Sequence, residues 1–552
     1  MTADKPADLV LTGGRIATMD AVRSWATALA VRGGRIVAVG PDAAVAAHIG
    51  QTTRVIELRG RMVTPGFGDA HVHPVHGGLA RLRCELHESR GLDTYLEIVE
   101  AYARANPDVA WIHGGGWSMD DFPGGVPSRR DLDRVSPDRP VFLTSRDGHS
   151  AWVNSKALKI AGITARTVDP VDGRFDREAD GSPGGGVQEG AQSIIEQFLP
   201  DTTAEELEAA LALAQTYLHS LGITTWQDAI VRPEEEERAY LALAGRDELT
   251  AKVVGALWWE RDRGVEQIDE LVDRRAATAI GRYRPTSVKL MMDGVLENFT
   301  GTMLEPYLDA SGKATGNRGI SMIEPSVLGA ALPRLDALGF QAHFHAIGDR
   351  AVRESLDAVA AARRANGPSD TRPHISHIQV IHPDDIGRFR ELGVVANAQP
   401  YWAAHEDQMD HLTIPFLGPE RASWQYPFRS LLDAGAMLAM GSDWSVSTPD
   451  PLAEMELAVN RVADYDRGRQ RPAFLPEQRI GLLDALAAFT MGTAYVNHQE
   501  QDTGSIEVGK AADLAVLDRD LFDRTAGAIG ETRCVATFVD GVAVYEDAAL
   551  DG

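Results

Sequence analysis

Short apolar runs recur through the middle of the chain, and this recurrence constrains the fold more than any other feature. Several are separated by amphipathic stretches such as 205–222 and 349–367. The runs are 141–146, 223–230, 287–294, 340–346, 373–380, 394–400 and 437–443. With VTPGFGDAHVH (63–73) as the first strand, the count reaches eight, and alternation with helices predicts an α/β fold of the TIM-like (β/α)8 barrel type. A doubly wound open sheet also alternates, so periodicity alone leaves both architectures open.

Both ends of the chain have a different pattern, with alternating apolar residues and Gly-Gly pairs between short runs rich in Val and Ile. This pattern is typical of β-hairpins, which rarely bury enough surface alone. We therefore predict a small composite β-sandwich built from both termini, residues 1–65 and 501–552, beside a barrel over 66–500. Loop insertions are expected around 112–190 and 295–325, because Gly114–Pro127 and Asp169–Gly190 are rich in Gly and Pro.

The net charge and composition of the chain indicate which binding partners and which cellular compartment to expect. The 552 residues carry a formal net charge of −26, which argues against nucleic acid and anionic membranes. The N-terminus lacks a signal-peptide pattern, and no apolar stretch approaches a membrane span. Two distant cysteines, Cys84 and Cys534, are expected to be free thiols in a reducing compartment. We expect a cytoplasmic protein that binds a small-molecule substrate and assembles as a homo-oligomer, with a dimer as the simplest form.

The first predicted barrel strand ends in the sequence His-x-His. His71 and His73 are separated by one residue, so on a strand both imidazoles point to the same side and can reach one ion. A solitary His-x-His pair is equally compatible with two polar residues on a half-exposed strand. His76 follows Pro74 and is predicted to lie in a loop.

Further candidates end the later strands. His343 and His345 occur together in one run, His374 and His377 in the next, and Asp443 ends the apolar run AMLAMGSDW. Each histidine alone is compatible with an ordinary polar residue near a strand end. In a barrel, however, the carboxyl ends of all strands converge on one mouth, so these residues can share a site. An aspartate that ends an apolar strand is also unusual, because burying an unpaired carboxylate is costly.

Lys289 lies between Val288 and Leu290 on a predicted strand. Such a lysine either extends outward to solvent or is held inside. A buried lysine loses its charge more readily and becomes nucleophilic, so it is able to react with carbon dioxide to form a carbamate. The residues themselves leave this choice open.

These motifs together resemble those of the metal-dependent amidohydrolase superfamily, in particular its YtcJ-like branch, which includes N-substituted formamide deformylase. The blocks that carry the resemblance are TPGFGDAHVHP, RDGHSAWVNSKAL, VKLMMDG, HAIGDRAV, ISHIQ, QPYWA, GSDWSVSTPDPL and GSIEVGKAADLAVLD. The resemblance implies a (β/α)8 barrel with a composite β-sandwich. It also implies a metal centre with Asp443 as the proton shuttle; the implied ligands are His71, His73, Lys289, His345 and His377. Glu189 is the alternative bridging ligand, and His343 competes with His345.

Imidazole and carboxylate-type donors favour zinc, bound as one or two ions, with other divalent metals possible. Such an ion lowers the pKa of a bound water towards about 7, and Asp443 is expected to carry the proton from that water to the leaving nitrogen. His149, placed at the end of the second strand, is expected to donate a hydrogen bond or contact the substrate. It is equally compatible with a structural loop residue.

The predicted reaction is hydrolysis of a non-peptide C–N bond, in an N-substituted formamide or a related amide. Trp117, Trp152 and Trp402 are candidates for the wall of an apolar substrate pocket, although ordinary packing also explains aromatic residues there. Esters, carbamates and lactams remain alternative substrates, and a non-catalytic binding barrel remains the alternative to an enzyme.

Overall fold

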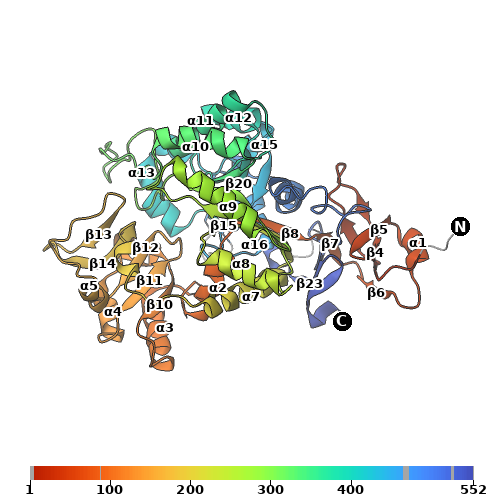
Figure 1. The fold of residues 1–552 in the computed structure, drawn as a ribbon, viewed down its shortest axis with the longest axis horizontal. Coiled ribbons are helices and arrows are strands. Elements are labelled where there is room, and N and C mark those ends of the chain that lie inside the picture. The colour runs from red at the N-terminus through yellow and green to blue at the C-terminus, as the bar shows by residue number, and fades with distance from the viewer. Residues whose placement is uncertain (1–4, 88, 464–470, 524–527, 551–552) are drawn as a thin grey trace.

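The computed structural model describes residues 5–87, 89–463, 471–523 and 528–550. Its centre is an eight-stranded parallel sheet in the order β21-β20-β19-β18-β17-β16-β15-β8 (Figure 1). The strands are β8 (Phe67–Val72), β15 (Ile223–Val231), β16 (Lys252–Trp258), β17 (Tyr283–Met291), β18 (Gln341–Ala346), β19 (His374–His377), β20 (Val395–Ala398) and β21 (Leu438–Met440). The Asp443 N–H, just after β21, donates to the His71 carbonyl on β8 at 2.8 Å. The two end strands therefore meet, and the predicted (β/α)8 barrel is confirmed.

Helices surround the strands because each has one apolar face. In α11 (Asp349–Asn366), Val352, Leu356 and Val359 recur at helical spacing and are buried in the main core. The other long helices are α7 (Ala204–Ser220), α8 (Glu236–Gly245), α9 (Ile268–Thr278), α10 (Pro325–Ala337), α12 (Pro383–Leu392) and α16 (Pro451–Asn460). The pleat of β18 sends Phe344 to the side opposite His343 and His345. The same alternation that builds the core therefore places the histidines inside the barrel.

The predicted strand assignment needs one correction. The run 141–146 contributes β11 (Val141–Ser145), which pairs with neighbours outside the barrel. The second barrel strand is β15, and the third is β16, which the sequence analysis did not single out. An apolar run indicates a strand, but the partners that a strand finds depend on the tertiary structure.

An insertion that separates α2 (Pro74–Leu82) from α7 forms a separate lobe (Figure 1). Its sheet has the order β13-β14-β12-β11-β10-β9. These strands are β9 (Cys84–Glu85), β10 (Ile112–Trp117), β11, β12 (Ser150–Val153), β13 (Gly173–Arg177) and β14 (Pro183–Glu189). Gly114–Trp117 and Gly173–Glu189 are therefore largely strands, where loops were expected. The segment 292–324 between β17 and α10 is irregular, with only an isolated bridge between Leu308 and Ala314.

Residues from both termini form a β-sandwich on the side of the barrel opposite the insertion (Figure 1). One sheet has the order β5-β4-β1-β6 and the other β24-β23-β22-β7-β2-β3. The first consists of β1 (Leu9–Thr12), β4 (Ala28–Arg32), β5 (Arg35–Gly40) and β6 (Arg54–Glu57). The second includes β2 (Arg15–Ala17), β3 (Trp25–Ala26), β23 (Cys534–Val539) and β24 (Val542–Glu546). β7 (Met62–Pro65) pairs antiparallel with β22 (Leu514–Leu517), so the two ends of the chain share one sheet. One apolar cluster contains residues from both ends, and the composite β-sandwich is confirmed. Residues 1–4, 524–527 and 551–552 of the predicted sandwich ranges lie outside the described residues.

Cys84 and Cys534 are buried free thiols, as expected. Among the described residues, no helix is long and apolar enough to cross a membrane.

Candidate metal centre

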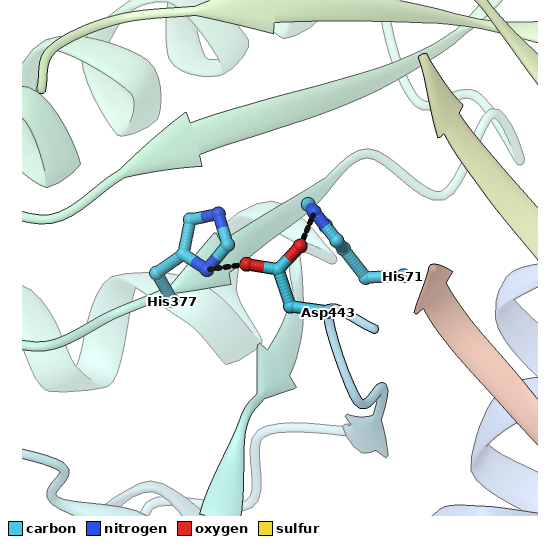
Figure 2. A group of neighbouring side chains, drawn as sticks. All are labelled: His71, His377 and Asp443. Carbon is cyan, nitrogen blue, oxygen red and sulfur yellow. Dashed lines mark ion pairs between the residues drawn. The ribbon is translucent and has the colours of Figure 1, made fainter. Parts of the chain in front are cut away.

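The two histidines at the end of β8 converge on one carboxylate. His71 Nε2 lies 3.2 Å and His73 Nε2 2.9 Å from Asp443 Oδ1. His377 Nδ1 lies 3.9 Å from the other oxygen, Oδ2, so the carboxylate lies between His71 and His377 (Figure 2). These atoms come from the first, sixth and eighth strands of the barrel. The barrel closure therefore brings together residues that are far apart in the sequence.

Two of these residues have unusual backbone conformations. Asp443 has φ 56° and His377 has φ 76°, both in the left-handed region that favours glycine. The surrounding structure holds each in place, because the Asp443 N–H donates to the His71 carbonyl and the His377 N–H donates to Gln399 Oε1 at 2.7 Å. Strain of this kind is concentrated at functional sites. Here it occurs at two residues that face the centre.

The structure separates the roles of His343 and His345. His343 Nε2 lies 2.7 Å from His71 Nδ1 and 3.0 Å from Ser376 Oγ, so it lies behind His71. The ring of His345 lies 4.3 Å from that of His377. His345 thus borders the centre, whereas His343 supports the far side of His71.

Burial gives these histidines an unusual charge state. It lowers the pKa of His71, His345 and His377 well below the ordinary value, and the nearby Lys289 adds to this effect. These imidazoles are therefore neutral at pH 7, and each retains a nitrogen lone pair. For Asp443, burial alone would raise the pKa, but the adjacent imidazoles of His73 and His377 hold it below the ordinary value. The carboxylate is therefore ionised.

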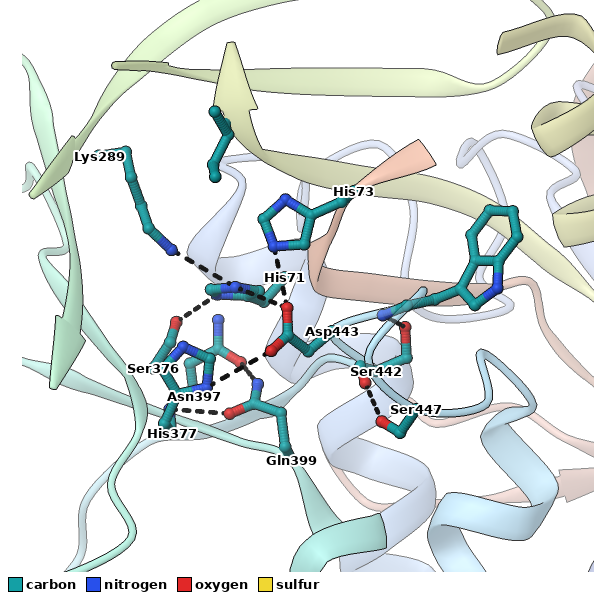
Figure 3. Close-up of polar contacts among 12 residues, drawn as sticks. His71, His73, Lys289, Ser376, His377, Asn397, Gln399, Ser442, Asp443 and Ser447 are labelled. Carbon is teal, nitrogen blue, oxygen red and sulfur yellow. Dashed lines mark hydrogen bonds and ion pairs between the residues drawn. The ribbon is translucent and has the colours of Figure 1, made fainter. Parts of the chain in front are cut away.

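Lys289 is buried in the barrel, with 2% of its surface exposed, and its Nζ lies 3.4 Å from His71 Nε2 (Figure 3). Among the described residues, no carboxylate lies within 4.0 Å of that nitrogen, and burial lowers the pKa of Lys289 to about 7. A substantial fraction of the side chain is therefore an uncharged amine at neutral pH.

Glu189 and His149 form a pair contributed by the insertion. His149 Nδ1 lies 2.9 Å from Glu189 Oε2, and the Thr300 hydroxyl donates to Glu189 Oε1 at 2.6 Å. Both oxygens of Glu189 are thus engaged in hydrogen bonds. His149 follows β11 in the insertion, not the second barrel strand, yet its ring lies 5.7 Å from that of His345. Burial alone would lower its pKa, but the charge and hydrogen bond of Glu189 raise the pKa of His149 to about 9.

A set of polar residues that sequence reasoning missed supports the centre. Asp69 accepts hydrogen bonds from the Ser442 hydroxyl at 2.5 Å and from the His71 N–H at 3.0 Å. Ser376 bonds His71 Nδ1 at 2.8 Å, which directs Nε2 towards Asp443 (Figure 3). Gln399 on the seventh strand holds His377. The sequence held a signal for two of these residues. Asp69 lies two positions before His71 and Ser376 two positions after His374, so on a strand each points to the same side as that histidine.

A cavity of about 780 Å³ lies beside this centre, between the barrel mouth and the insertion. Trp402 borders it and stacks on His377 with ring centroids 5.2 Å apart. Trp444, which the sequence analysis did not select, also borders it. Trp117 contacts the cavity but is fully buried, and its indole N–H donates to the Leu143 carbonyl at 2.8 Å. Trp152 lies in the insertion core against Phe122 and not at the cavity wall, so the packing interpretation applies there.

The donor set fits a metal ion. His71, His377 and Asp443 offer ligand atoms that all lie within 4.8 Å of one another. His73 Nδ1, His377 Nδ1 and Asp443 Oδ1 are buried without a hydrogen-bond partner, and buried polar atoms of this kind call for an explanation such as an ion. Neutral imidazoles and a carboxylate are the ligands that zinc and related divalent metals prefer.

Comparisons with known proteins agree with this geometry. The model of the amidohydrolase family matches residues 54–545. The chain is 32% identical to "Protein LONG AFTER FAR-RED 3" of Arabidopsis thaliana, over 98% of this chain and 92% of that protein. It is 28% identical to the N-substituted formamide deformylase of Arthrobacter pascens, over 98% of each. An uncharacterized metal-dependent hydrolase from Pyrococcus furiosus superposes with a TM-score of 0.70 at 26% identity, covering 93% of this chain and 99% of that one.

The chain therefore belongs to the amidohydrolase family, as the motifs predicted, and it is an enzyme of the hydrolase class.

Proposed function

We propose that this enzyme hydrolyses a non-peptide C–N bond, in an N-substituted formamide or a related amide, at the metal centre of the barrel mouth. The observation that carries the proposal is the convergence of His71, His73 and His377 on one strained aspartate, Asp443, beside a large cavity. The name of the deformylase relative supports the amide substrate class. Whether the physiological substrate is an amide, ester, carbamate or lactam is the question for the assay below.

The centre binds one or two divalent ions, with zinc as the first choice. The residues that hold them in this proposal are His71, His73, Lys289, His345 and His377. When bound, such an ion lowers the pKa of a coordinated water to about 7 and so supplies hydroxide at neutral pH. The cavity admits an organic substrate of ordinary size to this point.

Asp443 is the proton shuttle in this mechanism. Its carboxylate is ionised, because His73 and His377 hold its pKa low, so it is ready to accept a proton from the attacking water. It then delivers that proton to the leaving nitrogen, so that an amine departs instead of an unstable amide anion. The hydrogen bond from the Asp443 N–H to His71 fixes the carboxylate at the centre.

His149 contributes the hydrogen-bond donor. Its Nδ1 is held by Glu189, which leaves Nε2 to donate to the substrate carbonyl. Because Glu189 raises its pKa to about 9, the ring carries a positive charge at neutral pH. A charged donor stabilises the negative oxygen that develops during attack on the carbonyl.

Lys289 is carboxylated in the active enzyme. Its neutral amine forms an N–C bond with carbon dioxide and releases a proton, which yields a carbamate with two anionic-type oxygens. This product supplies oxygen ligands in the buried position where the free lysine has no carboxylate partner.

Metal analysis combined with an Asp443→Asn variant tests the proposal. The purified protein is assayed for zinc, manganese, iron and cobalt, and then with N-alkyl and N-benzyl formamides, acetamides, esters, carbamates and lactams. We expect bound metal, hydrolysis of at least one amide class, and a loss of kcat of about 10²- to 10⁴-fold in the variant.

Asp433→Asn is the matched control, because Asp433 is exposed on α15 (Phe428–Asp433) and pairs only with Arg429 among the described residues. It should retain wild-type activity. A metal-loaded wild type that cleaves no member of the panel would support a non-catalytic barrel instead. Cleavage of esters alone would contradict the C–N bond specificity and indicate an esterase instead.

A further inference from the structure

Among the described residues, four arginines border the cavity, and three of them interact with a carboxylate or an aromatic ring. Arg90 pairs with Asp120 and Asp121, and Arg471 pairs with Asp407 and Asp410. The guanidinium of Arg81 lies 3.9 Å from the ring centroid of Tyr217. The fourth arginine is Arg146.

Arg146 has a buried donor atom that is unsatisfied. Its Nη2 donates to the His87 carbonyl at 2.6 Å. Its Nε is buried without a hydrogen-bond partner, and no carboxylate among the described residues lies within 4.0 Å of its guanidinium. A buried donor without an acceptor costs about 1–3 kcal/mol, and more when the group is charged. Such a group at a cavity wall is typical of a ligand-binding residue.

The position of Arg146 relates it to the centre. It lies in the turn between β11 and β12, three positions before His149. The same turn thus presents His149 to the metal centre and Arg146 to the cavity beside it. A substrate with one end held by Arg146 in the cavity therefore has its other end directed towards the metal centre.

The geometry of Arg146 and the charges around it favour a carboxylate ligand over a phosphate. The planar fork of a guanidinium matches a carboxylate, which accepts two parallel hydrogen bonds. The carboxylates of Asp147 and Glu297 also border the cavity, and neither has a basic ion-pair partner among the described residues. Their charge disfavours a phosphate dianion more than a carboxylate.

We propose that Arg146 binds a carboxylate group of the substrate, remote from the scissile bond, and so selects C–N substrates that carry a negative charge. This inference rests on the proposed function for the reaction at the centre. The carboxylate preference itself is a property of binding, and it is measurable without turnover.

Binding is therefore measured in the Asp443→Asn background by calorimetry on the metal-loaded protein. The probes are the N-formyl ω-amino acids from N-formylglycine to N-formyl-6-aminohexanoate, each paired with an uncharged isostere that has isopropyl in place of the carboxylate. We expect the best carboxylate probe to bind at least about tenfold more tightly than its isostere. Adding Arg146→Gln should reduce this preference to less than about twofold.

Two further variants complete the test. Arg146→Lys keeps the charge but removes the planar fork, so the preference should fall at least about threefold; it provides the readout if Arg146→Gln does not fold. Arg130→Gln is the control, because Arg130 lies on α4 (Arg129–Val135) of the same insertion, is 68% exposed at its side chain and does not border the cavity. It should leave the preference unchanged.

The outcomes separate the two proposals. Equal affinities for each carboxylate and its isostere, or a preference that persists in Arg146→Gln, would overturn the role of Arg146. A carboxylate preference that depends on Arg146, together with no hydrolysis by the wild type, would uphold this role and refute the proposed function. Hydrolysis by the wild type without any carboxylate preference would uphold the proposed function and refute the role of Arg146.

Discussion

Two lysines on adjacent barrel strands have opposite environments. Lys252 begins β16, and its Nζ lies 2.6 Å from Asp513 and 3.2 Å from Asp540 of the sandwich; burial alone would lower its pKa, but these charges raise it. Lys289 lies near the end of β17 with no carboxylate within 4.0 Å among the described residues, and burial lowers its pKa to about 7. One end of the barrel thus joins two domains through paired charges. At the other end, Lys289 stays partly uncharged because no carboxylate among the described residues lies close to it.

The two ends also differ in the polar contacts of individual residues. At the sandwich end, Arg372 bonds Glu500 through two contacts of 2.8 and 2.9 Å. At the mouth, His73, His377 and Asp443 each retain an atom without a hydrogen-bond partner. The paired charges of Lys252 and Arg372 therefore serve stability at the amino ends of the strands, whereas these three residues at the carboxyl ends keep atoms available to a ligand.

The largest expected effect comes from Lys289→Met. Removal of this proposed metal ligand should lower kcat/KM by about 10³-fold, because metal chemistry supplies several kcal/mol of transition-state stabilisation. The folded structure should survive, because methionine suits a buried site that holds no counter-ion. Steady-state kinetics with metal analysis and circular dichroism check this. Wild-type activity in the variant would show that Lys289 is only a packing residue.

Lys252→Met should affect stability instead of activity. It leaves the fully buried Asp513 carboxylate without its nearest cation, and breaking a buried pair costs about 3 kcal/mol. Urea unfolding measures the loss, while kcat/KM of the folded protein should stay within about twofold of wild type. Lys156→Met on α5 (Ser155–Ile160) is the control, since Lys156 is exposed. An equal loss in both variants would contradict the assigned role of the ion pair.

The two lysines should also give opposite pH dependences of stability, on the order of 1 kcal/mol per pH unit. The folded-state pKa of Lys289, about 7, lies below its unfolded value, so folding releases a proton and stability rises with pH between about 7 and 10.4. The pKa of Lys252 is raised, so its contribution is full below about 10.4 and is lost as pH rises through the folded pKa.

The measurement is the difference in unfolding free energy between wild type and each methionine variant, from about pH 7 to 10.4 for Lys289 and above about pH 10.4 for Lys252. Metal-free protein in carbonate-free buffer keeps Lys289 as the free amine. Slopes of the same sign for the two lysines would refute the contrast between the two ends of the barrel.

The smallest expected effect concerns His149. Glu189 raises its pKa to about 9, so the ring is a charged donor at neutral pH and loses that charge above pH 9. His149→Gln should lower kcat/KM about fivefold at pH 7 and remove the decline above pH 9 that this histidine causes. A pH–rate profile of both proteins tests this. An unchanged alkaline decline would assign it to another group.

The sequence predicted the barrel more securely than its strand order. The alternation of Phe344 with His343 and His345 follows from the two-residue period of a strand, so their inward direction was predictable. The sequence did not predict that 252–258 forms a barrel strand while 141–145 forms a strand of the insertion, because both runs are equally strand-like. Their hydrogen-bonding partners lie far away in the sequence.

The aromatic and acidic candidates show a similar limit. Trp402 and Trp152 have similar sequence surroundings. Trp402 nevertheless borders the cavity, whereas Trp152 lies in the insertion core. The sequence offers Glu189 as an alternative ligand. In the folded chain, both of its carboxylate oxygens are engaged by His149 and Thr300. Burial and pairing are properties of the folded chain, and local residue patterns do not encode them.

By itself, the sequence determined which side chains point into the barrel and which chemistry they offer, because side-chain direction follows from the local period and reactivity from residue type. Only the tertiary structure decided that Lys289 has no carboxylate within 4.0 Å among the described residues while Lys252 has three. It alone placed Arg146 at the cavity wall with its Nε lacking a hydrogen-bond partner. Charge state and availability depend on what surrounds a group, and those neighbours come from segments hundreds of residues apart.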